Sequence, residues 1–137
     1  MRNVDEIWIV DPSGVTLFNL SKEDNIDPTL LGGFFSSLNM FIEQLGEKKL
    51  NSISLGDSKI MLYQGKFELM YISRSRKGVK EKVIQEHLNT IEKRFLKLHK
   101  DRIMSWDGNT TYFSNFGDFI EDIFKDSPER RIQESLW

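Results

Sequence analysis

The chain has 137 residues, a formal net charge of -2 and no cysteine. This length fits one domain that buries roughly two thirds of its unfolded surface without a metal or a disulfide. The slightly acidic balance argues against nucleic-acid binding, and the lack of cysteine excludes a disulfide framework, thiolate chemistry and zinc ribbons. No apolar run approaches ~20 residues and the N-terminus has no leader pattern, so we expect a cytoplasmic protein without a transmembrane segment.

The first predicted elements form a β-hairpin. Residues 7–10 (IWIV) are apolar at consecutive positions, which is typical of a strand that is covered on both faces of its sheet. Asp11, Pro12 and Gly14 suit the first, second and fourth positions of a type I turn, and the run VTLFNL at 15–20 follows directly. The two runs are therefore expected to pair as antiparallel strands.

A helix is predicted next, with Asp27 as its N-cap, Pro28 at its first position and Gly46 as its stop. At about 100° per residue, its large apolar side chains fall within an arc of roughly 140°, which is wide enough for a core face. These core candidates are Leu30, Leu31, Phe34, Phe35, Leu38, Phe41, Ile42 and Leu45. The helix is therefore expected to pack on the sheet through this stripe.

The opposite side of the helix is small and almost uncharged, and its residues are Gly32, Gly33, Ser36, Ser37, Met40 and Gln44. Gly32 and Ser36, like Gly33 and Ser37, are one turn apart, a spacing that lets a second backbone approach closely. We interpret this side as a partner or dimer interface; the alternative is a set of small exposed residues of low helix propensity. A phosphate loop is excluded because the glycines lie inside a helix and no Gly-Lys-Ser/Thr follows.

Three further strands are predicted at 50–55 (LNSISL), 59–64 (KIMLYQ) and 67–73 (FELMYIS), and the short turns between them favour an antiparallel meander. A basic loop follows the third strand and contains Arg74, Arg76, Lys77 and Lys80. Such a run is commonly a solvated turn. The functional alternative is contact with an anionic lipid headgroup or an acidic partner.

Two helices are predicted in the last third of the chain. The first begins near Val79 and carries an apolar seam of Ile84, Leu88, Ile91, Phe95 and Leu98 at alternating spacings of four and three. The second is short and contains Phe116, Phe119, Ile120 and Ile123. Residues 126–137 have the composition of a polar tail, which leaves 1–125 as one domain.

Residues that could carry chemistry are few. His87 and His99 lie at the edges of the long helix's seam, too far apart to share a metal, and are interpreted as boundary histidines. The run DGNTTYFSNFGD at 107–118 begins like a calcium loop, but Tyr112 stands where the sharp turn needs glycine and Asp118 where a bidentate Glu is expected. With no nucleophile, base and orienting group at usable spacing, we expect no enzyme, no cofactor and no metal site.

The order strand, strand, helix, three strands, helix, helix resembles the longin domain of the longin/roadblock superfamily. The resemblance covers about 4–124, and it rests on the hairpin EIWIVDPSGVTLFNL, the helix LLGGFFSSLNMFIEQLG and the meander LNSISLGDSKIMLYQGKFELMYISR. It implies an α+β, longin-like or profilin-like fold. Its five-stranded antiparallel sheet would carry one helix on one face and two helices on the other.

The resemblance also implies a function without catalysis. Longin and roadblock domains are interaction platforms in membrane trafficking and small-GTPase regulation, so the expected partners are a second copy or another longin/roadblock protein, and a small GTPase. The expected location is cytoplasmic, with at most peripheral membrane contact through partners. The alternative function is a small-molecule sensor of the profilin-like or PAS-like type, and an enzyme of an unrecognised kind is the third possibility.

Overall fold

The computed structural model describes residues 4–21, 28–44, 52–105 and 108–124. Its strands are β1 (Glu6–Val10), β2 (Thr16–Ser21), β3 (Ser52–Ser54), β4 (Ser58–Gln64) and β5 (Met70–Arg76). Its α-helices are α1 (Pro28–Gln44), α2 (Glu81–Met104) and α3 (Glu121–Phe124), and the 3-10 turns are η1 (Lys66–Glu68), η2 (Thr110–Phe113) and η3 (Phe116–Phe119). The predicted order of strands and helices is confirmed. The proposed caps Asp27 and Gly46, and the tail at 126–137, lie outside the described residues.

The five strands form one antiparallel sheet in the order β2-β1-β5-β4-β3. β1 joins the opening hairpin to the meander, because it pairs with β2 on one side and with β5 on the other. Trp8 of β1 therefore lies between Asn19 of β2 and Ile72 of β5, and Ile72 also faces Leu62 of β4. This register places the apolar positions of β1, β4 and β5 side by side on both faces of the sheet.

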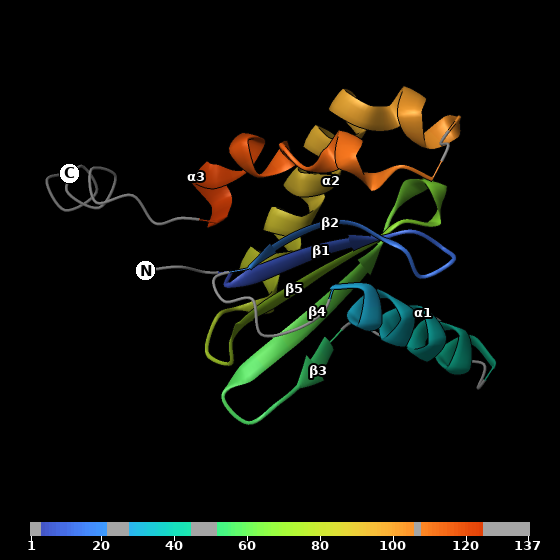
Figure 1. Ribbon diagram of the computed structural model, residues 1–137. Helices are drawn as coiled ribbons and strands as arrows, with labels where there is room; N and C mark the ends of the chain where they lie inside the picture. Colours follow the sequence, from blue (N-terminus) through green and yellow to red (C-terminus); the bar gives the residue numbers. More distant parts are fainter. Residues whose placement is uncertain (1–3, 22–27, 45–51, 106–107, 125–137) are drawn as a thin grey trace, which may run out of the picture.

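Helices cover both faces of the sheet, as Figure 1 shows: α1 lies on one side, and α2 with the 3-10 turns lies on the other. The larger core joins the α2 side of the sheet to the predicted seam of α2 and includes Ile7, Ile9, Tyr71, Ile84, Leu88, Ile91, Phe95, Phe113 and Phe116. The smaller core lies under α1 and consists of Trp8, Val10, Phe35, Leu62, Met70 and Ile72. The expected arrangement of layers is confirmed, although Leu98 of the predicted seam is exposed.

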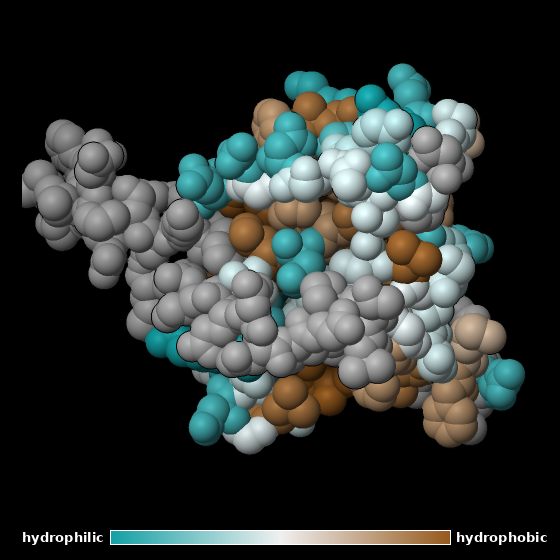
Figure 2. Space-filling view, viewed as in Figure 1, coloured by the Kyte–Doolittle hydropathy of each residue, from teal (hydrophilic) through white to brown (hydrophobic). Residues whose placement is uncertain are grey.

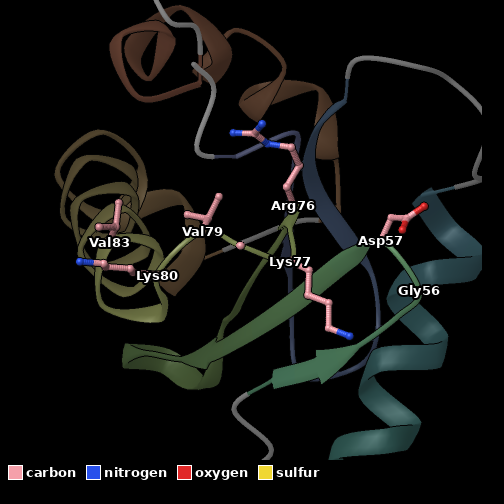
Figure 3. Close-up of a pocket in the computed structure, with 8 residues that line it drawn as sticks. Gly56, Asp57, Arg76, Lys77, Val79, Lys80 and Val83 are labelled. Carbon is pink, nitrogen blue, oxygen red and sulfur yellow. The ribbon is translucent and has the colours of Figure 1, made fainter.

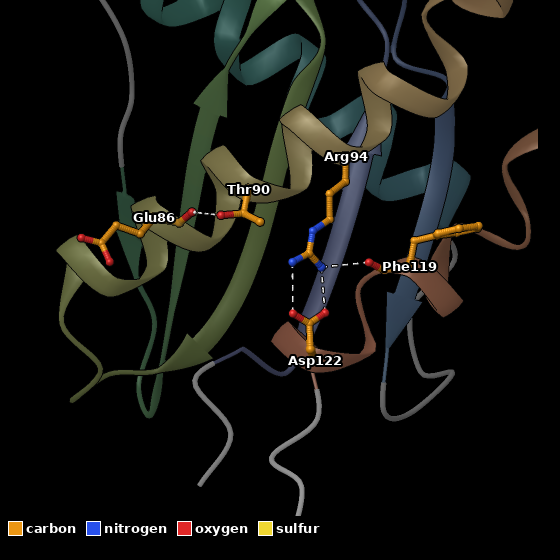
Figure 4. A network of polar contacts seen from close by, with 5 residues as sticks. All are labelled: Glu86, Thr90, Arg94, Phe119 and Asp122. Atoms are coloured by element: carbon orange, nitrogen blue, oxygen red, sulfur yellow. Dashed lines mark hydrogen bonds and ion pairs between the residues drawn. The ribbon is translucent and has the colours of Figure 1, made fainter. Parts of the chain in front are cut away.

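The segment after α2 differs from the single short helix expected there. Phe116 and Phe119 belong to the 3-10 turn η3, and the α-helical part begins only at Glu121. Arg94 of α2 holds this segment in place, because its guanidinium donates to both carboxylate oxygens of Asp122 at 2.7 and 3.1 Å and to the carbonyl of Phe119 at 2.9 Å (Figure 4). The hydrogen bond to Asp122 raises the pKa of Arg94 above its usual value. A bidentate pair of this kind fixes orientation as well as position.

A buried carboxylate fastens the connection between β4 and β5 to α2. Glu92 accepts hydrogen bonds from the Tyr63 hydroxyl at 2.9 Å and from the backbone N–H of Lys66 at 2.8 Å. The connection itself is strained, since Phe67 and Glu68 have φ of 61° and 59° without being glycine. Burial, together with the neighbouring Glu92, raises the pKa of Tyr63. Glu92 thus stabilises a turn whose own residues do not favour the positive φ that they adopt.

Among the described residues, no helix has both the length and the apolar character that crossing a membrane requires.

Candidate partner-binding surface

The β1–β2 turn is a compact structure that forms part of the surface around α1. Asp11 Oδ1 accepts from the backbone N–H of Ser13 and of Val15, both at 2.9 Å, and the Gly14 N–H donates to the Asp11 carbonyl at 3.0 Å. Gly14 has φ of +95°, a conformation that favours glycine. The predicted hairpin and its turn residues are confirmed.

Gly32 faces this turn of its own chain, which corrects the expectation that it points toward a partner. A Cβ added at Gly32 would lie 2.5 Å from the Gly14 carbonyl oxygen and 2.6 Å from Thr16 Oγ1. One turn further along, Ser36 Oγ donates to the Pro12 carbonyl at 3.2 Å. Gly32 and Ser36 are therefore the small residues that let the hairpin approach α1 closely.

Gly33 and its neighbours lie on the outside of α1. A Cβ added at Gly33 would meet no atom within 4 Å. Phe34, Met40 and Phe41 are 56%, 58% and 56% exposed. We call this surface the α1 stripe, and it consists of the exposed residues Gly33, Phe34, Ser37, Met40, Phe41 and Gln44. Figure 2 shows brown and tan atoms at the lower right, where Figure 1 places α1.

The α1 stripe differs from the predicted interface because the helix is rotated relative to the prediction. Phe34 and Phe41 were expected in the core and are exposed, whereas Phe35 is buried against Trp8 and Leu38 is half-buried. The remaining core candidates, Leu30, Leu31, Ile42 and Leu45, have side chains outside the described residues. A single charged residue near Phe34 or Phe41 would have marked the exposed side, but 28–42 contains none.

The four residues of the predicted basic loop do not share one environment. Arg74 lies on β5 and forms an ion pair with Glu6, its register partner on β1, so it does not belong to the loop. Arg76, Lys77 and Lys80 are exposed around an open hollow of about 710 Å³ that Gly56 and Asp57 also line (Figure 3). A small-molecule sensor needs an enclosed apolar cavity instead, so this hollow does not favour that alternative.

The histidines are half-buried at the edge of the α2 core, as expected. His99 packs against Phe95 and Phe113, with ring centroids 5.2 and 5.0 Å apart, and its burial lowers its pKa below the usual value. Within the described part of the chain, no three His, Asp or Glu side chains gather closely enough to hold a metal ion.

Comparison with known proteins gives structural likeness alone. No family model and no curated protein sequence matches the chain. Among solved structures, the mammalian SRP receptor aligns over 100% of both chains with 14% identity and a TM-score of 0.59. The chain has the longin/roadblock fold. A roadblock/LC7 domain from Streptomyces avermitilis (8% identity, TM-score 0.58) and MglB from Myxococcus xanthus (13%, 0.54) each match 69% of this chain, and 84% and 85% of their own.

Proposed function

We propose that this longin-type domain is a non-enzymatic scaffold that pairs through the α1 stripe with a second longin/roadblock chain, which can be a second copy of itself. In this proposal the pair then engages a small GTPase, as the resemblance to longin and roadblock domains implies. The observation that carries the proposal is the exposure of Phe34, Met40 and Phe41 on a helix with no charge between 28 and 42. Apolar side chains gathered in this way on a surface mark interaction sites.

The α1 stripe alone is smaller than a standard protein interface, so the proposed pairing also involves the neighbouring hairpin. Its three large side chains each expose a little more than half of their surface, together on the order of 350 Å². A standard interface buries about 800 Å² on each partner. The partner would therefore need further contacts, and the exposed Pro12, Ser13 and Val15 of the β1–β2 turn lie next to α1.

Two methionines provide a matched test of pairing. Met40 lies on the α1 stripe and Met104 at the end of α2, and they are 58% and 67% exposed. Met40→Glu is expected to weaken self-association at least about 10-fold, because an unpaired charge would be desolvated, while Met104→Glu leaves it unchanged. Sedimentation over a range of concentrations measures this, and equal effects of the two substitutions would contradict the assignment.

Gly33→Leu separates folding from pairing. The position is open, and leucine favours the helix by about 0.5–1 kcal/mol over glycine, so the monomer is expected to melt no lower than wild type. A closely packed partner cannot accommodate the added side chain, so association should weaken. A variant that loses its fold and associates like wild type would show that Gly33 belongs to the core.

The GTPase step has its own test. Purified small GTPases, each loaded with GDP or with a non-hydrolysable GTP analogue, are mixed with the protein and separated by gel filtration. We expect at least one to co-elute in only one nucleotide state. Uniform absence of co-elution would remove the GTPase from the proposal without affecting the pairing measured with Met40→Glu.

A further inference from the structure

Two turns lie side by side at one end of the sheet. One turn, at 55–57, joins β3 to β4, and the other, at 77–80, joins β5 to α2. The backbone N–H of Lys77 donates to the Asp57 carbonyl at 3.2 Å, which connects the turns directly. The ammonium group of Lys59 donates to the Val79 carbonyl at 2.8 Å and fixes the second turn from beneath. The pair therefore presents one defined surface.

This surface is basic in a chain that is acidic overall. Residues 74–82 (RSRKGVKEK) contain five basic residues and one acidic residue, whereas the whole chain has a formal charge of -2. Arg74 is paired with Glu6. Four exposed cations remain, Arg76, Lys77, Lys80 and Lys82, and none of them forms an ion pair with another residue in the described ranges. Asp57 and Glu81 offset part of this charge, so the surface is net positive.

The cations do not converge on one point. In Figure 3 the side chains of Arg76, Lys77 and Lys80 extend in different directions rather than toward a common point. A single phosphate needs donors that converge on it, whereas several separate anionic groups suit cations that fan out. Leu55, in the turn between β3 and β4, adds an apolar side chain that is 44% exposed.

We propose that these two turns form a contact surface for an anionic membrane, with Arg76, Lys77, Lys80 and Lys82 facing the headgroups and Leu55 at the acyl boundary. The proposal is independent of pairing through the α1 stripe. Each cation near an anionic leaflet increases binding about fivefold, so four of them give a weak, reversible contact. Such a contact would orient the domain on a surface without anchoring it.

Vesicle flotation with the full chain tests the proposal against a matched charge control. Wild type is expected to float with millimolar vesicles of phosphatidylcholine containing about 30% phosphatidylserine, and not with phosphatidylcholine alone. Lys77→Ser with Lys80→Ser should reduce binding about 25-fold. Lys93→Ser with Lys97→Ser removes the same charge from exposed positions on α2 and should leave binding unchanged.

The outcomes are distinct. Binding that vanishes at about 0.5 M salt and weakens in Leu55→Ser supports the surface as described. Absence of wild-type binding, or equal loss in the two double variants, overturns it. Binding of soluble poly-glutamate at this surface without binding to vesicles also overturns it, in favour of an acidic protein segment. Met40→Glu should float like wild type, which separates this proposal from the failure of pairing.

Discussion

Gly32 and Gly33 are adjacent in α1, and alanine substitution is expected to change the stability of the protein in opposite directions at the two positions. At Gly32 the new Cβ would lie 2.5 Å from the Gly14 carbonyl oxygen and 2.6 Å from Thr16 Oγ1, so the hairpin or the helix must move. The Gly14 oxygen is backbone in a turn that Asp11 holds by several hydrogen bonds, and it cannot rotate away.

The magnitudes follow from two opposing terms. Overpacking costs about 1–3 kcal/mol, and contact with a fixed backbone atom places Gly32→Ala near about 3 kcal/mol. Alanine favours the helix over glycine by about 1 kcal/mol, which leaves a net loss of about 2 kcal/mol. At Gly33 the added Cβ would meet no atom within 4 Å, so only the helix propensity of alanine contributes. Gly33→Ala should therefore raise the free energy of unfolding by about 0.5–1 kcal/mol.

Urea denaturation and thermal denaturation of wild type and both variants measure the difference. At about 3–4 °C per kcal/mol for a domain of this size, Gly32→Ala should lower the melting temperature by about 6–8 °C and Gly33→Ala should raise it by about 2–4 °C. Unchanged m-values would show that both act on the folded state. If the two variants shift stability in the same direction, α1 does not dock on the hairpin in this rotation, and the exposure of the α1 stripe loses its basis.

Two further predictions concern buried polar groups on the α2 side. Glu92→Ala should cost about 2–3 kcal/mol in urea denaturation, because the Tyr63 hydroxyl and the Lys66 N–H would both lose their acceptor; Tyr63→Phe should cost only about 1 kcal/mol, and equal costs would contradict this assignment. His99 should make stability depend on pH. Burial lowers its pKa, so on acidification the unfolded chain binds a proton before the folded protein does. The contribution of His99 to stability is therefore complete above about pH 7 and falls as the pH drops through about 6.5. Denaturation between pH 5 and 8 should show a shallower slope in His99→Gln, and an unchanged slope would assign it to another group.

The sheet and α2 could be predicted from the sequence because their signals are local and strong. Short turns specify the meander, and the seam of α2 repeats over four turns. The rotation of α1 could not be predicted, because apolar and small residues surround the helix and no charge distinguishes its faces between 28 and 42. What fixes the rotation is a tertiary contact between Gly32 and the β1–β2 turn.

Polar pairs between residues far apart in the sequence could not be predicted either. Arg74 lies near the end of β5 in a basic run, and only the pairing of β5 with β1 places Glu6 opposite it. Glu92 is adjacent to the apolar seam of α2. From the sequence alone, it would be expected at the exposed, polar border of that seam. Its partners, Tyr63 and Lys66, come from a strained turn whose left-handed residues, unlike glycine, carry no signal in the sequence.

The contact at Gly32 links the fold of this domain to its proposed partner surface. The hairpin turn sits against Gly32 and Ser36, and this contact leaves Gly33, Phe34 and Met40 on the outside of the same helix. A helix rotated by one residue would bury Phe34 in place of Phe35 and turn the glycines outward, because neighbouring positions differ by about 100°. The two small residues would therefore act on the proposed pairing indirectly, by determining which side of α1 is available. A substitution at Gly32 should weaken association together with stability, whereas a bulky substitution at Gly33, such as Gly33→Leu, should weaken association without lowering stability.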